Sequence, residues 1–253
     1  MTVLAAAFVA GGIDAIVGGG GLIQVPALFT ALPSALPSTL LGTSKLAGLA
    51  GTASAAARYV RSVAVPWRTI VPAMALASLA SLLGAAAVTH VSPRLFRPLV
   101  PVALLVVLGY TLAHRDLGRV HAPRMHGRRG AFGGLALIAL IGGYDGFFGP
   151  GTGSFLMLLF VRHYGFDFLN AAAAARCVNV ATNAMALAWF GAHGAVLWPL
   201  GIAMALANVA GAQLGARLAL RRGAGFVRAL FVVIVGALIA KTAWDACSQL
   251  ARG

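Results

Sequence analysis

GGIDAIVGGGG at residues 11–21 returns, 131 positions along the chain, as GGYDGFFGPGTG at residues 142–153. Glycine and proline in such clusters prevent a continuous helix. In hydrocarbon, the backbone groups that a break frees are tolerated only where protein or a water-filled cavity satisfies them. Two equivalent breaks in an otherwise apolar chain therefore predict a functional site to which both stretches contribute.

The composition indicates a membrane protein. Of 253 residues, 60% are hydrophobic and 9% are charged, and the mean hydropathy is +0.91, which leaves too little polar surface to cover a soluble globule. The apolar runs are continuous and rich in alanine and leucine, which favours helices over the alternating strands of a barrel. We predict an all-α polytopic fold with membrane-spanning runs at 39–57, 69–89, 95–113, 131–148, 171–190, 195–216 and 226–244. Segment 1–17 is also apolar, and two shorter segments, 22–32 and 153–161, reach only about halfway across a bilayer, which predicts re-entrant half-helices.

The repeat extends far beyond the glycine clusters. The same offset of 131 relates several unlike residues: Asp14 to Asp145, Phe29 to Phe160, Lys45 to Arg176, Trp67 to Trp198 and Arg97 to Arg228. Coincidence of single small residues is common in a chain so rich in alanine and glycine, but joint coincidence of these types is not. We predict two homologous transmembrane repeats, 1–113 and 131–253, joined by a basic linker, 114–130.

The placement of basic residues predicts how the halves are oriented, because lysine and arginine concentrate in cytoplasmic loops. The linker holds five arginines and is predicted to be cytoplasmic. Eight more basic residues then fall on the same side, four fall outside, and Lys45 and Arg176 remain within the membrane. Loop 58–68 carries three arginines and its counterpart 189–199 carries none, so the repeats are predicted to have inverted topology. Each half crosses the membrane five times, with a short pair, or three times with a re-entrant hairpin, and both termini lie outside.

Several kinds of partner and cofactor are not expected. The net charge of +14 reflects loop topology, so no nucleic-acid partner is predicted. Cys177 and Cys247 form neither a disulfide framework nor a paired-cysteine metal site. Histidines 114, 121 and 126 lie in the arginine-rich linker and are expected to be solvated, and the N-terminus lacks the basic region of a cleavable signal peptide. We predict no metal and no cofactor. The predicted partners are a small anionic substrate and membrane lipid, and the oligomeric state is unknown from sequence.

The chemistry around the breaks favours an anion. Inverted repeats with discontinuous helices are typical of secondary transporters, whose substrates bind between the repeats near the midplane. Each half-helix begins just after a break, so its unpaired N–H groups and positive dipole end point inward. A neighbouring helix in each half adds one cation, and polar residues follow at helical spacing. The predicted substrate-binding residues are Lys45, Arg176, Thr43, Ser44, Thr52, Asn179, Asn183, Gly19, Gly20, Gly21, Gln24, Gly151, Thr152, Gly153 and Ser154.

Structural interpretations compete with these assignments. Lys45 and Arg176 lie only about five residues into their apolar runs, from which long side chains can snorkel to the surface. Asp14 and Asp145 are candidate proton-coupling groups, and are alternatively partners of the cations or caps on amides at the breaks. For Gly11, Gly12, Gly84 and Gly215 we prefer a role in close helix packing.

The chain resembles the sulfite exporter TauE/SafE-like permeases over nearly its whole length. The resemblance rests on residues 18–26, GGGGLIQVP, on residues 42–45, GTSK, and on residues 149–153, GPGTG. It implies a bacterial inner-membrane transporter of small sulfur-containing anions such as sulfite, sulfoacetate or other organosulfonates, often in export. The sequence around Arg176 differs from the matching sequence of the first half. Thr43 and Ser44 precede Lys45, whereas alanines precede Arg176.

The leading hypothesis is an anion transporter that works by alternating access. A subsidiary hypothesis is that Asp14 or Asp145 exchanges a proton during transport. An anion channel built from the same residues, or a carrier of another small anion, is the alternative. An enzyme is disfavoured because the chain contains no zinc-protease pattern and no compelling nucleophile or paired-aspartate motif.

Overall fold

In the computed structural model, which describes residues 2–91 and 128–250, the chain is helical. Within these ranges it forms eight helices and no strand, which confirms the all-α prediction there: α1 (Thr2–Val17), α2 (Gly21–Ala31), α3 (Pro37–Val60), α4 (Trp67–Thr89), α6 (Arg128–Phe147), α7 (Thr152–Arg162), α8 (Phe168–Ala192) and α9 (Trp198–Leu250). The expected run 95–113, the linker up to residue 127 and its three histidines lie outside the described residues. Residues 128–130, predicted to belong to the linker, are the first residues of α6.

The helix bounds repeat at the offset seen in the sequence. α7, α8 and α9 begin at residues 152, 168 and 198, each 131 residues after the starts of α2, α3 and α4 at residues 21, 37 and 67. α2 and α7 contain 11 residues each, which corresponds to about 16 Å of helix and about half of a bilayer core. Equivalent sequence signals therefore place equivalent helices in the two halves.

The glycine clusters interrupt the helices at the predicted places. α1 ends at Val17 before α2 begins, and α6 ends at Phe147 before α7 begins. Gly18 has a φ of +83° and Gly149, its equivalent, a φ of +93°. This left-handed conformation is strained for a residue that carries a Cβ. The two glycines therefore let the chain leave one helix and enter the next within a few residues.

The two halves pack closely against each other. α1 lies along α9, α6 lies along α4, and α3 and α8 contact each other between these pairs. A Cβ on Gly84 would collide with the carbonyl oxygen of Gly143, and one on Gly215 with that of Gly12. One on Gly11 would collide with a backbone carbonyl of α9. Small residues that let backbones approach are characteristic of helix packing in membranes, and the packing role predicted for these glycines is confirmed.

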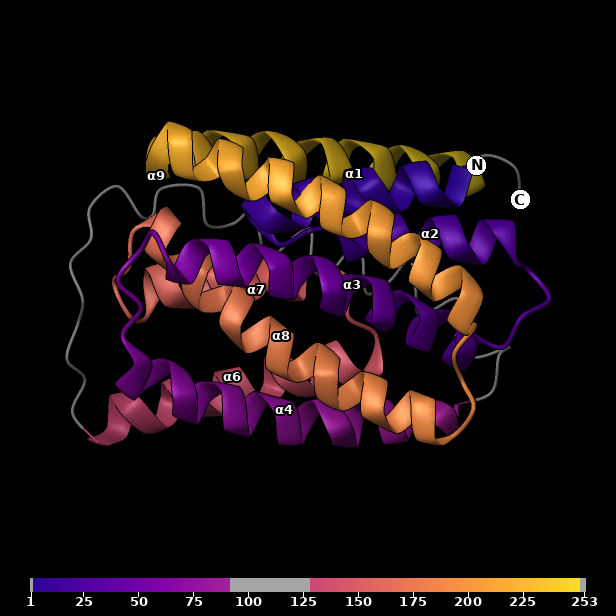
Figure 1. Ribbon diagram of the computed structural model, residues 1–253, viewed down its shortest axis with the longest axis horizontal. Coiled ribbons are helices and arrows are strands. Elements are labelled where there is room, and N and C mark those ends of the chain that lie inside the picture. The colour runs from indigo at the N-terminus through magenta and orange to yellow at the C-terminus, as the bar shows by residue number, and fades with distance from the viewer. Residues whose placement is uncertain (1, 92–127, 251–253) are drawn as a thin grey trace.

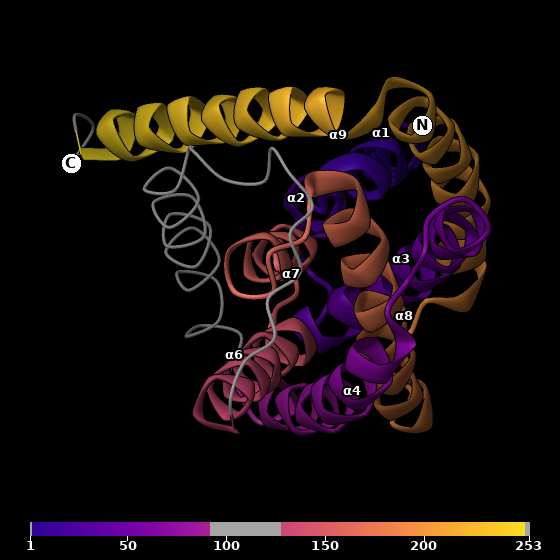
Figure 2. The same ribbon diagram turned by 90° about the vertical axis from the view of Figure 1, so that its left-hand side faces the viewer.

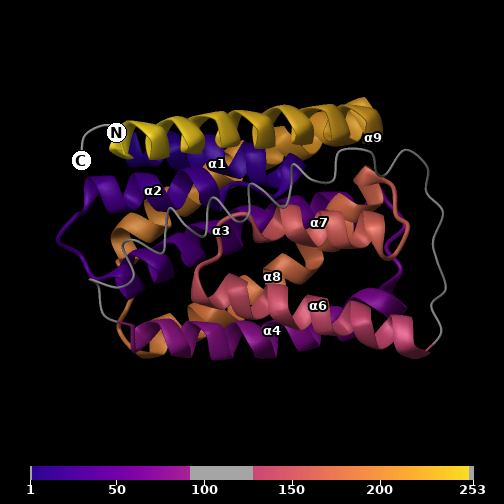
Figure 3. The ribbon, with the colours of Figure 1, turned by 180° about the vertical axis from the view of Figure 1, so that it is seen from behind.

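Equivalent connections between helices lie at opposite ends of the bundle. In Figure 1 the α3–α4 connection lies at the left and the α8–α9 connection at the right. The α2–α3 connection lies at the right and the α7–α8 connection at the left, and the view from behind in Figure 3 agrees. Each end of the bundle thus carries one connection from each half.

α9 consists of two helical segments that meet at Gly223, where φ is +74° and ψ is −174°. Figure 2 shows the first segment packed beside α3 and the second turning in a different direction. The bend lies between the two apolar runs, 195–216 and 226–244, that the sequence predicts as separate helices.

The outer faces of the bundle are apolar. Trp67 and Trp198 lie at the starts of α4 and α9 with 45% and 49% of their surface exposed, as expected of residues at a membrane interface. Two described helices, α4 and the segment Trp198–Leu230, are long and apolar enough to cross a membrane. Large apolar side chains are exposed along both: Val71, Leu79, Leu83, Ile202, Leu206, Leu214 and Leu218. Such a surface suits lipid, because a soluble protein rarely exposes apolar side chains so continuously.

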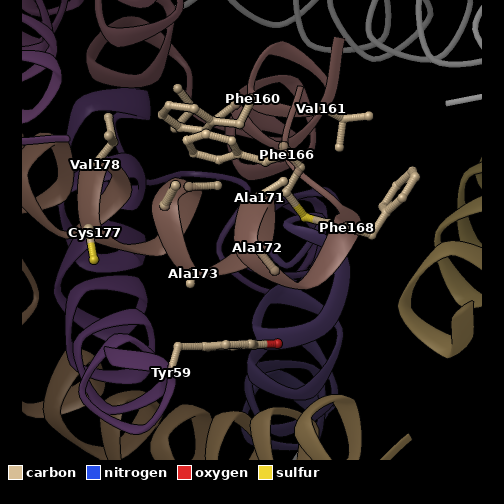
Figure 4. Packing of buried hydrophobic residues seen from close by; sticks show 14 of the residues in the cluster. Tyr59, Phe160, Val161, Phe166, Phe168, Ala171, Ala172, Ala173, Cys177 and Val178 are labelled. Carbon is tan, nitrogen blue, oxygen red and sulfur yellow. The ribbon is translucent and has the colours of Figure 1, made fainter. Parts of the chain in front are cut away.

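The interior around α8 is tightly packed. Residues 171–175 of α8 are alanines with no exposed surface, so neighbouring helices can approach closely. Figure 4 shows Phe160 and Phe166 on one side of this segment and Tyr59 on the other. The two phenylalanine rings stack with centroids 5.7 Å apart, and the Tyr59 hydroxyl donates to the Ala15 carbonyl at 2.9 Å. This packing holds α8, and the basic residue that follows the alanines, in a defined position.

Candidate functional site

The two helix breaks touch each other inside the bundle. The Ser154 amide donates to the Gly18 carbonyl at 3.2 Å, and the Ser154 hydroxyl donates to the Val17 carbonyl at 2.8 Å. A Cβ on Gly18 would collide with the backbone of Gly153. The start of α7 is therefore hydrogen-bonded to the end of α1, and the breaks form one junction.

An ion pair joins the two halves beside this junction. Lys45 Nζ, from α3, lies 2.8 Å from Asp145 Oδ2, from α6, and the two side chains are 7% and 2% exposed. A Cβ on Gly149 would lie 3.0 Å from the same ammonium, so the second break leaves room for the lysine. Of the predicted roles of Asp145, that of a partner for a cation is confirmed.

Neither basic residue reaches the surface. Lys45 is 6% exposed and Arg176 is 0% exposed, and each is the ninth residue of its helix, counted from Pro37 and from Phe168. The snorkelling alternative is therefore wrong. The helices start two and three residues before the apolar runs 39–57 and 171–190, because Pro37 at the first turn of α3 and Asp167 at the N-cap of α8 begin them earlier.

Asp14 makes contacts unlike those of its equivalent. Its Oδ2 accepts from the Thr52 hydroxyl at 3.1 Å, and its Oδ1 accepts from the Gly20 amide at 3.3 Å. The predicted alternative of a cap on an amide at the break is confirmed. Among the described residues, no cation lies within ion-pair distance of Asp14.

Side-chain amides connect the first break to α3 and α9. Gln24 Nε2 donates to the Ser44 carbonyl at 3.0 Å and to its hydroxyl at 2.9 Å. Asn208 Nδ2 donates to Gln24 Oε1 at 2.8 Å. On α8, Asn183 Nδ2 donates to Asn179 Oδ1 at 3.3 Å. Because each bond uses only part of an amide's capacity, further donors and acceptors remain for a bound molecule.

These groups surround a cavity of about 50 Å³ available to the centres of water-sized molecules. One water needs about 10–15 Å³ by this measure, so the cavity holds a few waters or one small ion. Eleven predicted site residues line it: Asp14, Gly20, Gly21, Gln24, Ser44, Lys45, Thr52, Asp145, Gly153, Asn179 and Asn183. The site predicted from sequence is thus largely brought together around one cavity.

Arg176 is not among the residues that line this cavity. Its Nη2 lies 3.6 Å from Met157 Sδ, and its Nε and Nη1 have no hydrogen-bond partner in the described part of the chain. The guanidinium therefore lies behind the second break, beside α7, and not opposite Lys45. The expected arrangement, in which both cations face one anion, is absent from this conformation.

Five other predicted residues also lie off the cavity. The Thr43 hydroxyl donates to the Thr39 carbonyl at 2.7 Å and accepts from the Leu197 amide at 2.9 Å. The Thr152 hydroxyl donates to the Gly149 carbonyl at 2.7 Å. These hydroxyls, like that of Ser154, satisfy backbone groups at connections and breaks. Gly19 and Gly151 shape the breaks without lining the cavity.

With this geometry established, comparison with known proteins identifies the family. Residues 3–242 match the sulfite exporter TauE/SafE family. The chain belongs to this family. Its TauE/SafE membership supports a membrane transporter and not an enzyme.

Relatives of this TauE/SafE protein carry matching names. It is 40% identical over 235 residues to "Probable membrane transporter protein ORF9" of Sinorhizobium sp., an alignment that covers 92% of this chain and 88% of the relative. It is 36% identical to a "Probable membrane transporter protein" of Haemophilus influenzae, covering 94% and 92%. It is 35% identical to "Probable membrane transporter protein YfcA" of Escherichia coli K12, covering 96% and 89%. No solved structure matches the chain.

Sequence reasoning missed several cavity residues of this TauE/SafE protein. Asn208, 4% exposed, is the principal omission. A polar amide inside the apolar run 195–216 could have indicated a site residue. The equivalent position in the first half is Ala77, however, so the repeat did not single out Asn208. The other omissions are small or apolar lining residues: Gly18, Val25, Leu41, Gly48, Phe148, Gly149 and Pro150.

Alanine at Gly18 is expected to destabilise the protein strongly. The residue has a left-handed backbone, for which a side chain costs about 1–3 kcal/mol, and a Cβ would also collide with Gly153. Gly48→Ala is the matched control, because Gly48 lines the same cavity and a Cβ there meets nothing within 4 Å. Thermal unfolding of the purified variants measures the difference. Equal melting temperatures would contradict both the left-handed backbone of Gly18 and its close contact with Gly153.

Proposed function

We propose that this protein is a secondary transporter of small sulfur-containing anions, which exports them across the inner membrane by alternating access. One observation carries the proposal: a single ammonium, Lys45, faces a small cavity where two interrupted helices meet. Substrate sites of secondary transporters are typically built from such discontinuous helices.

The donors around the cavity suit an oxyanion. The Lys45 ammonium has three donors and the Asp145 carboxylate uses one of them. Amide groups of Asn179 and Asn183 and the Ser44 hydroxyl lie around the same space. Charge-assisted hydrogen bonds to an ionised oxygen are about twice as strong as neutral ones, so an anion gains more from these groups than a neutral solute does.

The size of the cavity favours the smaller members of this substrate class. Its volume of about 50 Å³ corresponds to a few water molecules, at about 10–15 Å³ each. Sulfite, a pyramidal ion with four heavy atoms, matches this space better than an organosulfonate such as sulfoacetate. We therefore propose sulfite as the preferred substrate in this conformation.

The charges in the cavity support coupling to protons. With Asp14 and Asp145 both ionised, the residues that line the cavity, Lys45 included, carry a formal charge of −1. An anion that enters would meet repulsion from the carboxylate that Lys45 does not neutralise. A proton on one carboxylate removes the repulsion. Asp145 is held by the ammonium at 2.8 Å and Asp14 receives only neutral donors, so we propose Asp14 as the proton carrier.

The arrangement of the connections supports the topology proposed from the sequence. The α3–α4 connection is flanked by Arg58, Arg61 and Arg68, and the α7–α8 connection follows Arg162; both lie at the left in Figure 1. Residues 32–36 and 193–197, which form the connections at the other end, contain no lysine or arginine. Because basic loops favour the cytoplasm, we propose that the left end is cytoplasmic. The repeats are then inverted, α2 and α7 are re-entrant, and the termini lie outside.

Sulfite exchange in proteoliposomes tests the proposed activity. Vesicles loaded with unlabelled sulfite are expected to accumulate labelled sulfite at a rate that saturates, and sulfoacetate is expected to compete less well. Lys45→Gln is expected to lower the rate by about thirtyfold or more, the effect of removing one member of a buried charged contact. Arg61→Gln is the control, since Arg61 lies in an exposed connection.

Two results would contradict this proposal. Equal rates of sulfite exchange by the parent and by Lys45→Gln would show that Lys45 does not bind the substrate. A conductance that does not saturate and needs no exchange partner would replace the transporter with an anion channel.

A further inference from the structure

Four charged residues form two equivalent sets. The offset of 131 relates Lys45 to Arg176 and Asp14 to Asp145. The ion pair of the structure joins the lysine of the first half to the aspartate of the second. If each residue of this pair is replaced by its equivalent in the other half, the result is a pair between Arg176 of the second half and Asp14 of the first.

That counterpart is not formed in this conformation. Arg176 is fully buried, and its Nε and Nη1 have no partner among the described residues. Asp14 accepts from a hydroxyl and a backbone amide. In the described part of the chain, Arg176 Nη2 meets only the weak thioether acceptor of Met157. A buried guanidinium without a carboxylate is costly, so a second conformation that supplies one would relieve this cost.

Both members of the missing pair flank the same junction of the breaks. A Cβ on Gly153 would lie 3.0 Å from Arg176 Nη1 and 2.6 Å from the Cα of Gly18. Gly18 donates its amide to the Asp14 carbonyl oxygen at 2.9 Å, and the Asp14 carboxylate caps Gly20. The formed pair lies beside the other break, because a Cβ on Gly149 would be near both Lys45 Nζ and Asp145 Oδ1.

We propose that the protein exchanges its ion pairs during transport: Lys45–Asp145 closes one side of the site in this conformation, and Arg176–Asp14 closes the other side in the opposite-facing conformation. The inference rests on the proposed alternating access. Each state contains one buried ion pair, one cation without a carboxylate and one aspartate without a cation, so the two states have the same charge balance. Two conformations close in energy are what a ligand needs in order to shift the population between them.

Access to the cavity from each side of the membrane tests the exchange. Cys177→Ala and Cys247→Ala remove both cysteines, and Gly48→Cys adds a reporter at a cavity position with open space around it. A membrane-impermeant maleimide is applied to right-side-out and to inside-out vesicles without any anion. The ratio of the two labelling rates reports the populations of the two conformations.

Arg176→Gln and Lys45→Gln are expected to change this ratio in opposite directions, by about tenfold each, within the usual range of conformational coupling. Arg176→Gln prevents the Arg176–Asp14 pair, which this conformation lacks, so the variant favours the present conformation. Asp14→Asn should have the same effect. Lys45→Gln removes the formed pair and favours the opposite conformation. Arg176→Lys keeps the charge and should restore the parental ratio.

Thermal unfolding separates this role from a purely structural one. Arg176→Gln removes an unpaired buried charge from the present conformation, so it should unfold no earlier than the parent. The proposed exchange of ion pairs would be overturned if Arg176→Gln and Lys45→Gln shifted the labelling ratio in the same direction. It would also be overturned if both variants were well folded and neither shifted the ratio. A further outcome is that the two variants shift the labelling ratio in opposite directions although the parent protein transports no sulfite. In that case the exchange of ion pairs is supported, and only the proposed substrate is wrong.

Discussion

Lys45→Gln is expected to lower the free energy of unfolding by about 3–5 kcal/mol, the usual effect of breaking a buried ion pair. Asp145, at 2% exposure, would lose the ammonium 2.8 Å away and remain buried without a charged partner. Glutamine is similar in length but uncharged. Reversible unfolding in mixed micelles of SDS and a mild detergent measures the loss, and Arg61→Gln, in an exposed connection, gives the baseline for removing a basic residue.

A double variant separates stability from transport. Lys45→Gln with Asp145→Asn removes both charges, so the unpaired carboxylate disappears and most of the lost stability should return. Sulfite exchange should not return, because the ammonium that binds the anion is still missing. A double variant as unstable as Lys45→Gln alone would show that the lysine stabilises the fold through packing and not through Asp145.

Asp14→Asn is expected to abolish accumulation of sulfite driven by a pH gradient while exchange of sulfite for sulfite continues. Exchange needs the anion site but no net movement of protons, whereas accumulation needs a group that takes up and releases a proton in each cycle. Asparagine keeps the shape of the side chain and its oxygen can still accept from Thr52 or Gly20. Accumulation and exchange are both measured in proteoliposomes, with and without an imposed pH gradient.

Asp167→Asn is the matched control for this experiment. Asp167 caps α8, where its Oδ1 accepts from the Asn170 amide at 2.7 Å, and asparagine caps helices about as well as aspartate. This variant should keep both activities. Gradient-driven accumulation by Asp14→Asn at the parental level would exclude Asp14 as the proton carrier and leave Asp145 as the remaining candidate.

Much of the site could be predicted because its determinants are local. Glycine at positions 18 and 149 predicts a break wherever the chain folds, since the left-handed backbone there depends on the residue itself. The offset of 131 then assigned a carboxylate and a cation to each half. Lys45, Ser44, Thr52 and the two asparagines of α8 could be placed near one another because they follow at helical spacing on two helices beside the breaks.

The errors all concern contacts between distant segments. Arg176 is equivalent to Lys45 in sequence, yet its side chain points behind the second break toward Met157. Asn208, on α9, is far along the chain from either glycine cluster, yet it lines the cavity and donates to Gln24. Neither outcome follows from spacing along the chain, because each depends on how separate helices pack: α8 against α7 for Arg176, and α9 against α2 for Asn208.

The sequence by itself determined that the chain is helical and apolar, that it contains two related halves, and that each half is interrupted beside one aspartate and one basic residue. Backbone conformation, hydropathy and repeat register are properties of short segments, so a single sequence suffices to read them. Only the tertiary structure decided that the breaks touch, that Lys45 pairs with the aspartate of the other half, and that Arg176 has no carboxylate partner in the part of the chain that the structure describes. Two related halves must differ in conformation to form one asymmetric cavity, and that difference arises from packing, which no local signal encodes.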